Sequence, residues 1–454
     1  MNFIGRTNEI EILSRSISKK PSFVVLFGRR RVGKTTLLEK ATHHEKRFFF
    51  TFSNSNSKIQ MREFKSSASS YLNDPLLPKI EGDWYDIFRY FMEKVTPGSL
   101  IILDEFTYAV RSDKKVVSDL QRTWDHLGLN KQLRIVLCGS LMGMMKDEVL
   151  SHNSPLYGRR TRDIELEPLS LRESLKLFKD PFYGAQAYMA VGGMPQHLSM
   201  AADHEDIKGL IENEFLDKNG YFFREGDYLV AQDLKDQRTY NSILRAISLG
   251  NTTSSQISDA AGMENKKIYP YLDSLKRLSW IEKEKPLDGD PKKGIYKLKD
   301  PMLHLWYNLT NRMRQAIELE MASYSKEIVH PVLGGLFEDL ARRVLIEYRS
   351  ELGLKFDRIG PWWWKEDEID IAMVDDISKR VHIVECKYGK LKDLDVGRIL
   401  NDLRRKWKKT SWSKKDLEMN PIVFCLDYDG RRKDVLSLRK IMNGINSNKQ
   451  DRQN

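Results

Sequence analysis

The N-terminal part of the chain alternates short apolar runs with helical patterns. Residues 23–27, 100–103 and 134–138 are apolar and rich in β-branched and aromatic side chains, as is typical of buried parallel strands. Residues 35–42, which follow the first run, have the composition of a helix start. The alternation predicts an α/β domain with a parallel sheet, and we place this domain at residues 1–168.

The rest of the chain changes its pattern several times. Residues 169–235 are helical, with an internal break at residues 192–195. Residues 236–300 predict three helices and then two alternating strand-like segments, which is the order of a winged helix, and Pro270 either interrupts the third helix or marks its first turn. We further expect a helical connector over residues 301–330, a second α/β domain over residues 331–446 and a flexible tail over residues 447–454.

A phosphate-binding motif lies directly after the first apolar run. Residues 28–35, GRRRVGKT, fit the pattern G-x-x-x-x-G-K-[ST] between an expected strand and an expected helix, where free backbone N–H groups and the helix dipole point at phosphates. The alternative is a glycine-rich surface turn. The three arginines of the loop could meet phosphates, acidic neighbours or solvent. The predicted nucleotide-binding residues here are Gly28, Gly33, Lys34, Thr35 and Thr36.

An acidic pair ends the second apolar run. Asp104 is expected to hold Mg²⁺ together with Thr35, while Glu105 could orient the attacking water. The alternative is a solvated strand end. Ser140, after the third run, is either a nucleotide-site hydroxyl at the carboxyl edge of the sheet or a helix cap. These residues predict an ATP site with Mg²⁺.

The chain resembles the AAA-like STAND-type P-loop ATPases, and more narrowly the mainly archaeal ATPases that carry a nuclease-like C-terminal domain. The resemblance rests on residues 3–9 (FIGRTNE), the two nucleotide motifs, residues 155–159 (PLYGR) and residues 192–195 (GGMP). It implies that residues 169–235 form a lid that moves with nucleotide state. It also implies that Gly5, Arg6 and Glu9 pack against the base and ribose.

The same resemblance gives Arg159 a catalytic role. It matches an arginine that completes the site near the γ-phosphate, either in cis or from a neighbouring subunit of a homo-oligomer. A guanidinium stabilises the charge that phosphoryl transfer spreads over oxygens. The alternative is a surface arginine that follows a tight turn.

Composition narrows the class of protein. The 454 residues include 75 Lys and Arg against 64 Asp and Glu, and this net charge of +11 favours polyanionic partners. Cys138, Cys386 and Cys425 lie in apolar runs without metal spacing, so buried thiols in a reducing compartment are expected. No signal-peptide pattern and no long apolar run is present. We therefore predict a cytoplasmic protein without a membrane partner.

A second acidic constellation lies near the C-terminus. Glu368 and Asp370 alternate with apolar residues on one predicted strand, and Glu385 and Lys387 do so on the next. Across the hairpin, two carboxylates could hold Mg²⁺ while the lysine steadies the nucleophile or the developing charge. The alternative is ordinary cross-strand charge pairing.

This arrangement resembles the core of the PD-(D/E)XK, restriction-endonuclease-like superfamily. The resemblance implies that Asp370 and Glu385 are metal ligands and that Lys387 is the catalytic lysine. Glu338 matches the acidic residue of the preceding helix, which makes it a further metal ligand. Related domains can keep the fold for binding only.

Basic residues suggest nucleic acid, with DNA as the expected form. Residues 403–415 interleave tryptophans with cations, which suits phosphate neutralisation and base stacking, or alternatively a solvated helix with its tryptophans in the core. The winged helix could bind DNA or serve only in packing. Its expected DNA-facing residues are Lys266, Lys267, Lys276, Arg277, Lys292 and Lys293.

Two functions follow from these features. The first is an ATP-driven switch coupled to a Mg²⁺-dependent DNA nuclease, in DNA processing or defence against foreign DNA. The second is a regulatory or signalling ATPase whose winged helix and nuclease-like domain only bind nucleic acid or a partner. An intact Asp370, Glu385 and Lys387 favour the first.

Overall fold

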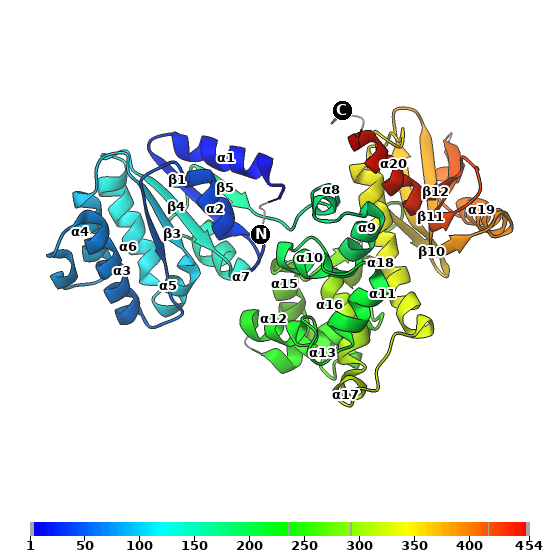
Figure 1. The fold of residues 1–454 in the computed structure, drawn as a ribbon, viewed down its shortest axis with the longest axis horizontal. Coiled ribbons are helices and arrows are strands. Elements are labelled where there is room, and N and C mark those ends of the chain that lie inside the picture. The colour runs from blue at the N-terminus through cyan, green and yellow to red at the C-terminus, as the bar shows by residue number, and fades with distance from the viewer. Residues whose placement is uncertain (1–3, 235, 291–292, 416, 451–454) are drawn as a thin grey trace. The chain divides into compact units, whose positions relative to one another are not determined.

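The computed structural model describes residues 4–234, 236–290, 293–415 and 417–450. The chain divides into two compact units, Met1–Leu169 and Ser170–Asn454 (Figure 1). Among the described residues, none of the helices combines the length and the apolar character needed to cross a membrane.

The first unit is built on a five-stranded parallel sheet with the strand order β2-β3-β4-β1-β5. The central strands β1 and β4 are buried at every position, because both faces of the sheet are covered by helices. This confirms the parallel-sheet core expected from the apolar runs. The strands are β1 (Ser22–Phe27), β2 (Arg47–Thr51), β3 (Leu100–Asp104), β4 (Arg134–Gly139) and β5 (Arg162–Glu165), and the main helices are α1 (Thr7–Ser18), α2 (Lys34–Thr42), α3 (Ser57–Leu72), α4 (Trp84–Lys94), α5 (Phe106–Ser112) and α6 (Lys115–Thr123).

The second unit begins with short helices. The expected break is present, because α9 ends at Val191, Gly192 takes a φ of 70°, and α10 begins at Pro195. Helix α9 packs against two later helices, α18 (Lys326–Glu347) and α20 (Leu438–Gln450). This helical segment therefore belongs to the second unit. The helices are α8 (Leu171–Ser174), α9 (Pro181–Val191), α10 (Pro195–Ala201), α11 (Ile207–Leu210) and α12 (Glu225–Asp233).

Three helices and a hairpin follow, in the order that the pattern predicts. Pro270 lies in the first turn of α15, where its missing N–H costs no helical hydrogen bond. Strands β6 and β7 pair antiparallel, with Ile281 opposite Leu298 at one end and Glu284 opposite Ile295 at the other. The elements are α13 (Gln237–Ser248), α14 (Ser254–Ala260), α15 (Tyr269–Arg277), β6 (Ile281–Glu284) and β7 (Ile295–Leu298).

The C-terminal sheet is mixed, with the order β12-β11-β10-β9-β8. Strands β8, β9 and β10 pair antiparallel, whereas β10, β11 and β12 pair parallel. Helix α19 packs on one side, and α18 and α20 pack on the other (Figure 1). The elements are α16 (Pro301–Leu305), α17 (Arg314–Glu318), α18 (Lys326–Glu347), β8 (Arg358–Trp364), β9 (Asp367–Asp375), β10 (Arg380–Leu391), α19 (Asp393–Trp407), β11 (Glu418–Tyr428), β12 (Val435–Ser437) and α20 (Leu438–Gln450).

The start of the predicted tail falls within the last helix. Helix α20 continues to Gln450, whereas a flexible tail was expected from residue 447. Residues 451–454 lie outside the described part of the chain.

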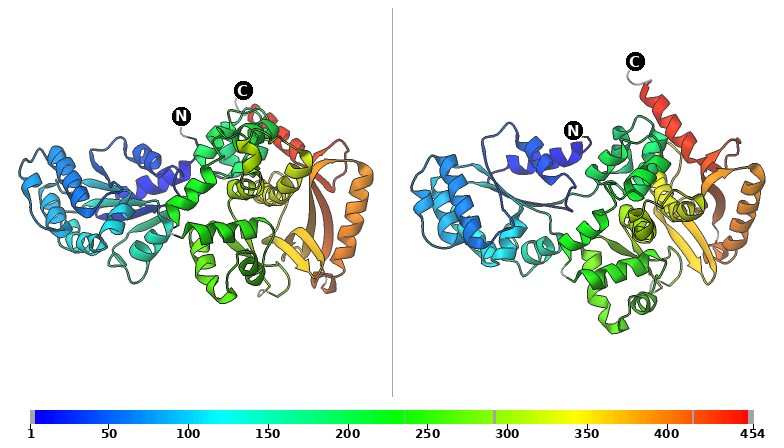
Figure 2. Two further views of the ribbon diagram at one scale, coloured as in Figure 1. Left: turned by 90° about the horizontal axis from the view of Figure 1, so that it is seen from below. Right: turned by 60° about the horizontal axis from the view of Figure 1, so that its bottom comes forward.

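The loop between β6 and β7 is bound to the C-terminal sheet domain. The Leu287 backbone N–H donates to the Pro361 carbonyl at 2.8 Å, and Asp288 accepts the Ser411 backbone N–H at 2.9 Å. Leu287 also packs against the apolar cluster of that domain. In both views of Figure 2 the green helices accordingly lie beside the yellow strands of the C-terminal sheet. Lys292, an expected DNA contact of this loop, lies outside the described residues.

Candidate active sites

The phosphate loop joins β1 to α2, as the motif requires. Gly28 is needed because a Cβ there would lie 2.5 Å from the Leu166 carbonyl oxygen. Gly33 takes a φ of 97°, which opens α2 with its first N–H groups directed into the loop. Thr36 is exposed in the first turn of α2.

Lys34 is folded back onto its own loop. Its Nζ donates to the carbonyl oxygens of Gly28 and Arg29, at 3.0 Å each. Burial lowers the pKa of Lys34 from its usual value, since the ammonium is largely removed from water. The lysine is therefore held where nucleotide phosphates would replace the carbonyls as its partners.

The acidic pair and two hydroxyls meet at the carboxyl edge of the sheet. Thr35 Oγ1 donates to Asp104 Oδ2 at 3.0 Å, so the two expected Mg²⁺ ligands are adjacent. Asp104 is 2% exposed, at the end of β3. Glu105 takes a φ of 51°, and its carboxylate accepts a hydrogen bond from Ser140 Oγ. Ser140 thus bonds a site carboxylate, and Leu141 holds the N-cap position of the next helix.

The N-terminal segment reaches the phosphate loop through Arg6. Its guanidinium donates to the Val32 carbonyl oxygen at 3.2 Å and to Glu9 Oε1 at 3.0 Å, and it is 4% exposed. Gly5 and Arg6 both take positive φ values, of 74° and 62°. The geometry places this segment against the phosphate loop, while its packing against the base and ribose stays a prediction. In the same region Arg30 donates to the Tyr108 hydroxyl at 2.9 Å.

The cis role of Arg159 is wrong. Arg159 precedes the amino end of β5, which runs parallel to β1, whereas the phosphate loop follows the carboxyl end of β1. Its guanidinium instead donates to both Asp125 carboxylate oxygens, at 3.2 and 3.1 Å. Because the two ends of the sheet are separated by the length of a strand, Arg159 does not reach its own phosphate loop.

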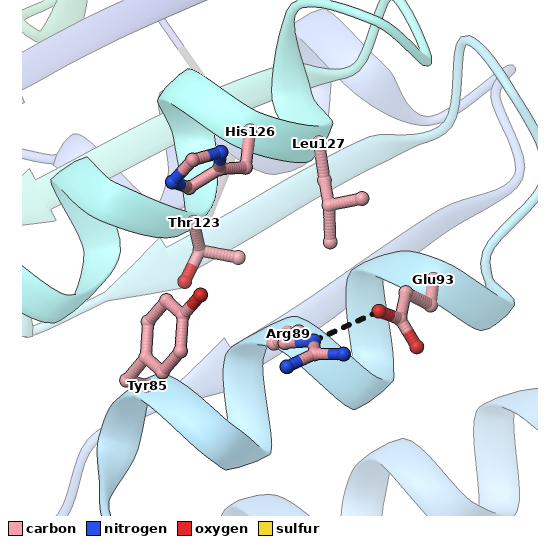
Figure 3. Close-up of a pocket in the computed structure, with 6 residues that line it drawn as sticks. All are labelled: Tyr85, Arg89, Glu93, Thr123, His126 and Leu127. Carbon is pink, nitrogen blue, oxygen red and sulfur yellow. Dashed lines mark hydrogen bonds and ion pairs between the residues drawn. The ribbon is translucent and has the colours of Figure 1, made fainter.

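A pocket of about 230 Å³ lies elsewhere in the first unit. Figure 3 shows that it is lined from α4, by Tyr85, Arg89 and Glu93, and from the chain around residues 123–127. Arg89 pairs with Glu93 at 3.0 Å. None of its lining residues was a predicted site residue, and none belongs to the phosphate loop.

The second constellation lies where β9 and β10 separate. The pairing of these strands ends at Ile371 and Val384, and Asp370 Oδ2 accepts the backbone N–H of Cys386 at 2.6 Å. Asp370 therefore turns toward β10 at the point where Glu385 and Lys387 follow. Lys387 Nζ donates to Glu385 Oε1 at 2.9 Å.

Sequence reasoning missed a second partner of Glu385. Lys406 of α19 donates from Nζ to Glu385 Oε2 at 3.0 Å and also lies 3.1 Å from Asp402 Oδ2. Lys406 is buried, and although burial opposes its charge, the bond to Glu385 raises its pKa. It was hidden in the basic run of residues 403–415, and only the packing of α19 on the sheet identifies its partner.

Burial and mutual repulsion raise the pKa values of two carboxyls of this cluster. Burial, and next the charge of Glu385, raise the pKa of Asp370 to about 7. Burial, and next the charge of Asp370, raise the pKa of Glu338 to about 8. The negative charges of Asp370 and of the exposed Glu368, both on β9, therefore act on Glu338 of α18 and raise its pKa.

The fit to a metal is incomplete in this conformation. Within the described residues, no group of three or more His, Cys, Asp or Glu side chains is close enough to hold a metal ion. The donor types suit Mg²⁺, since Asp370, Glu385 and Glu338 offer carboxylate oxygens. Glu385, however, has both oxygens bound by ammonium groups.

Several basic residues have partners other than a nucleic acid. Trp412 is 2% exposed and belongs to the apolar cluster of the sheet, so the stacking interpretation is wrong for this residue, whereas Trp407 is partly buried against the same cluster. Lys293 lies over the Trp364 ring at 4.9 Å. Lys267 pairs with Glu264 at 2.8 Å and Lys276 with Asp273 at 2.6 Å, while Lys266 and Arg277 are exposed.

The cysteines behave as predicted. Cys138, Cys386 and Cys425 are free and buried, and burial raises the pKa of each thiol. None is a poised nucleophile.

Comparison with known proteins agrees with the first site. A family model described as an ATPase domain predominantly from Archaea matches residues 3–201. A second model, described as Archaea bacterial proteins of unknown function, matches residues 306–399, which include Glu338, Asp370, Glu385 and Lys387.

Individual proteins extend this match over most of the chain. The uncharacterized protein MJECL04 of Methanocaldococcus jannaschii is 30% identical over 420 residues, which cover 89% of this chain and 92% of that protein. The uncharacterized ATP-binding protein MJ0423 of the same organism is 42% identical over 45 residues, 10% of this chain and 76% of that protein. The solved Walker-type ATPase PABY2304 of Pyrococcus abyssi has 20% identity and a TM-score of 0.51, over 68% of this chain and 96% of that chain.

The fold and the phosphate loop define a P-loop ATPase, an enzyme that hydrolyses ATP. The chain belongs to the same family as MJECL04, and its N-terminal domain is of the ATPase type that occurs predominantly in Archaea.

Proposed function

We propose that this ATPase controls a Mg²⁺-dependent nuclease in its C-terminal sheet domain, with DNA as the substrate. The observation that carries the proposal is the meeting of Asp370, Glu385 and Lys387 where β9 and β10 separate. The element order α18, three antiparallel strands, α19 and β11 supports it, since a nuclease-like core has a helix before and after such strands.

The residues have separable roles in this proposal. Mg²⁺ bound by Asp370 and Glu385 would neutralise charge on the scissile phosphate. Lys387, whose side chain is 44% exposed, is the group that can reach a phosphate oxygen and stabilise negative charge. Burial of Asp370 and Glu338 keeps water from competing for these groups.

At the ATPase site, Thr35 and Asp104 would hold Mg²⁺ beside the nucleotide phosphates, while Glu105 orients the attacking water with the help of Ser140. The hydrogen bonds between these residues support the assignment. Arg159 would act only on a neighbouring copy of the chain, because it lies at the opposite edge of its own sheet.

DNA would bind along α15, which we interpret as the recognition helix of a winged helix. Tyr269 and Arg277 are exposed on α15, and Lys266 is exposed in the turn just before it. The hairpin loop contributes less than expected, because Leu287 and Asp288 are bound to the sheet domain.

A regulatory ATPase is the second candidate. It is favoured by the two ammonium groups on Glu385 and by the lack, among described residues, of a ready three-ligand metal cluster. In that case the C-terminal unit binds nucleic acid without cutting it.

A cleavage assay separates the two candidates. The full chain is incubated with linear, nicked, single-stranded and branched DNA in Mg²⁺, Mn²⁺ or chelator, with and without ATP. The nuclease proposal expects metal-dependent cleavage that Asp370→Ala abolishes while ATP hydrolysis stays within about twofold, because the centres belong to different units. Tight DNA binding without cleavage of any form would support the regulatory candidate.

A further inference from the structure

Glu385 is compensated by two lysines that come from different elements. Lys387 is two residues further along β10, and Lys406 lies on α19, which packs over this face of the sheet. Each ammonium holds one carboxylate oxygen, at 2.9 and 3.0 Å. The side chain of Glu385 is 12% exposed, so little water screens these contacts.

The two lysines differ in exposure and therefore in freedom. The Lys387 side chain is 44% exposed and can turn toward a substrate. The Lys406 side chain is 10% exposed and is fixed by a second carboxylate, Asp402, one helical turn earlier on α19. Lys406 therefore remains bonded to Glu385, because separating the two would leave a buried charge without its partner.

We propose that Lys406 is a positioning residue of the nuclease centre: it fixes the Glu385 carboxylate against α19 and lowers the affinity of the centre for a divalent cation when no substrate is bound. This inference rests on the proposed nuclease function. A cation that approaches Glu385 meets an ammonium already bonded to it, and the two positive charges repel at short range. A nucleic-acid phosphate would offset this repulsion, so the centre binds its cation well only together with substrate.

The test measures Mn²⁺ affinity of the full chain without nucleotide, from the signal of free Mn²⁺. All variants carry Asp104→Asn, which removes the carboxylate that would bind cation at the phosphate loop. The part of the binding that Asp370→Ala abolishes is assigned to the C-terminal centre. Lys406→Gln keeps a hydrogen bond to Glu385 without the charge, and Lys406→Arg keeps the charge. The control is Lys408→Gln, at the exposed residue that directly follows the same helix.

Lys406→Gln should bind Mn²⁺ about tenfold more tightly, because one positive charge within a few ångströms of the cation is gone. Lys406→Arg and Lys408→Gln should stay within about twofold of the parent. A purely structural lysine would lower the midpoint of thermal unfolding without tightening Mn²⁺ binding, and that result overturns the inference. Should Lys406→Gln not fold, Lys387→Gln removes the more exposed counter-charge of the same carboxylate and must tighten binding too.

The failure of this inference differs from the failure of the proposed function. If Asp370→Ala removes no Mn²⁺ binding even with uncleaved DNA present, the nuclease centre itself is absent. If Asp370-dependent binding exists but is equal in the parent and in Lys406→Gln, only the role of Lys406 is wrong. Added DNA should tighten Mn²⁺ binding of the parent more than that of Lys406→Gln, and an equal effect on both also contradicts the proposal.

Discussion

The two candidate sites use the same residue types in opposite ways. At the phosphate loop, Lys34 is bonded to backbone carbonyls, while Asp104 is bonded to the neutral hydroxyl of Thr35. In the C-terminal cluster, Lys387 and Lys406 are bonded directly to Glu385. At the first site, therefore, the lysine and the aspartate do not form an ion pair with each other. At the second site, the lysines and the glutamate do.

This difference decides what each site can bind on its own. A carboxylate with neutral partners keeps its attraction for Mg²⁺, and a lysine on carbonyls can exchange them for phosphates without breaking an ion pair. An ion-paired carboxylate must lose a partner before it coordinates a cation. We therefore expect the ATPase site to bind Mg²⁺ and nucleotide readily, and the C-terminal cluster to need its substrate.

The largest effect is expected for Lys34→Ala. Loss of the ammonium that meets the β- and γ-phosphates should lower kcat/KM for ATP hydrolysis by about a hundredfold or more. Asp104→Asn should act in the same direction through weaker Mg²⁺ binding. Phosphate release over a range of Mg²⁺ concentrations measures both, and Lys58→Gln on the exposed side of α3 is the control. Undiminished ATP turnover in Lys34→Ala would contradict the assignment of the phosphate loop as the nucleotide site, and with it the contrast between the two sites.

Any cleavage of DNA in the absence of ATP should be unchanged in Lys34→Ala, while its response to ATP should disappear. A loss of cleavage without ATP would mean that the two sites are not independent.

A smaller effect is expected at Glu105, whose carboxylate accepts a hydrogen bond from Ser140. Glu105→Gln should slow hydrolysis about 10- to 100-fold and leave ATP affinity within about threefold, because the amide cannot accept a proton from the attacking water. Ser140→Ala should slow hydrolysis only several-fold, since it removes one hydrogen bond that orients Glu105. Equilibrium binding of a fluorescent ATP analogue separates affinity from turnover. An equal loss of both in Glu105→Gln would make Glu105 a structural residue.

How much the sequence predicts also differs between the sites. The phosphate loop is contiguous, and its chemistry depends on backbone groups between a strand and a helix, so residues 28–35 suffice to place it. Asp104 and Ser140 follow from the rule that parallel strands end at one edge. The cis role of Arg159 failed because a turn motif does not reveal which end of the sheet the turn occupies.

The C-terminal cluster depends on contacts between distant elements. Strand alternation placed Asp370, Glu385 and Lys387 near one another, but Lys406 is 21 residues from Glu385 and meets it only through the packing of α19. The same packing buries Trp412, which a basic amphipathic pattern cannot distinguish from an exposed stacking residue. Which face of a helix is buried depends on its partner, and the local sequence does not contain the partner.

The buried carboxyls of the C-terminal cluster predict that the stability of the second unit depends on pH. The pKa of Glu338 is raised from 4.5 to about 8 in the folded chain, so the folded state binds this proton more tightly than the unfolded state. The contribution to stability is then fully present below pH 4.5 and is lost as the pH rises through about 8. We expect the second unit to lose on the order of 5 kcal/mol of unfolding free energy over this range.

Glu338→Gln should remove most of that dependence and make the chain more stable at pH 8.5 than the parent. Urea unfolding with chelator, followed by tryptophan fluorescence, is a suitable measurement because seven of the nine tryptophans lie in the second unit. Glu418→Gln, a surface carboxylate paired with Arg380, is the control and should leave the dependence intact. A parent whose stability rises with pH over this range contradicts the burial argument.

The smallest effect concerns DNA binding, where the proposal depends on the exposed residues Lys266 and Arg277. If α15 lies against DNA, affinity should fall steeply with salt, because each phosphate contact releases counterions. The pair Lys266→Gln and Arg277→Gln should flatten the slope of log K against log salt by about 2, whereas Lys293→Gln should change it little, since Lys293 lies over the Trp364 ring. The matched control is Lys58→Gln with Arg62→Gln on the exposed side of α3 in the first unit. A slope that the α15 pair leaves unchanged, but that the α3 pair flattens, would move the DNA interface to the ATPase unit and leave the second unit without the substrate contact that its proposed chemistry requires.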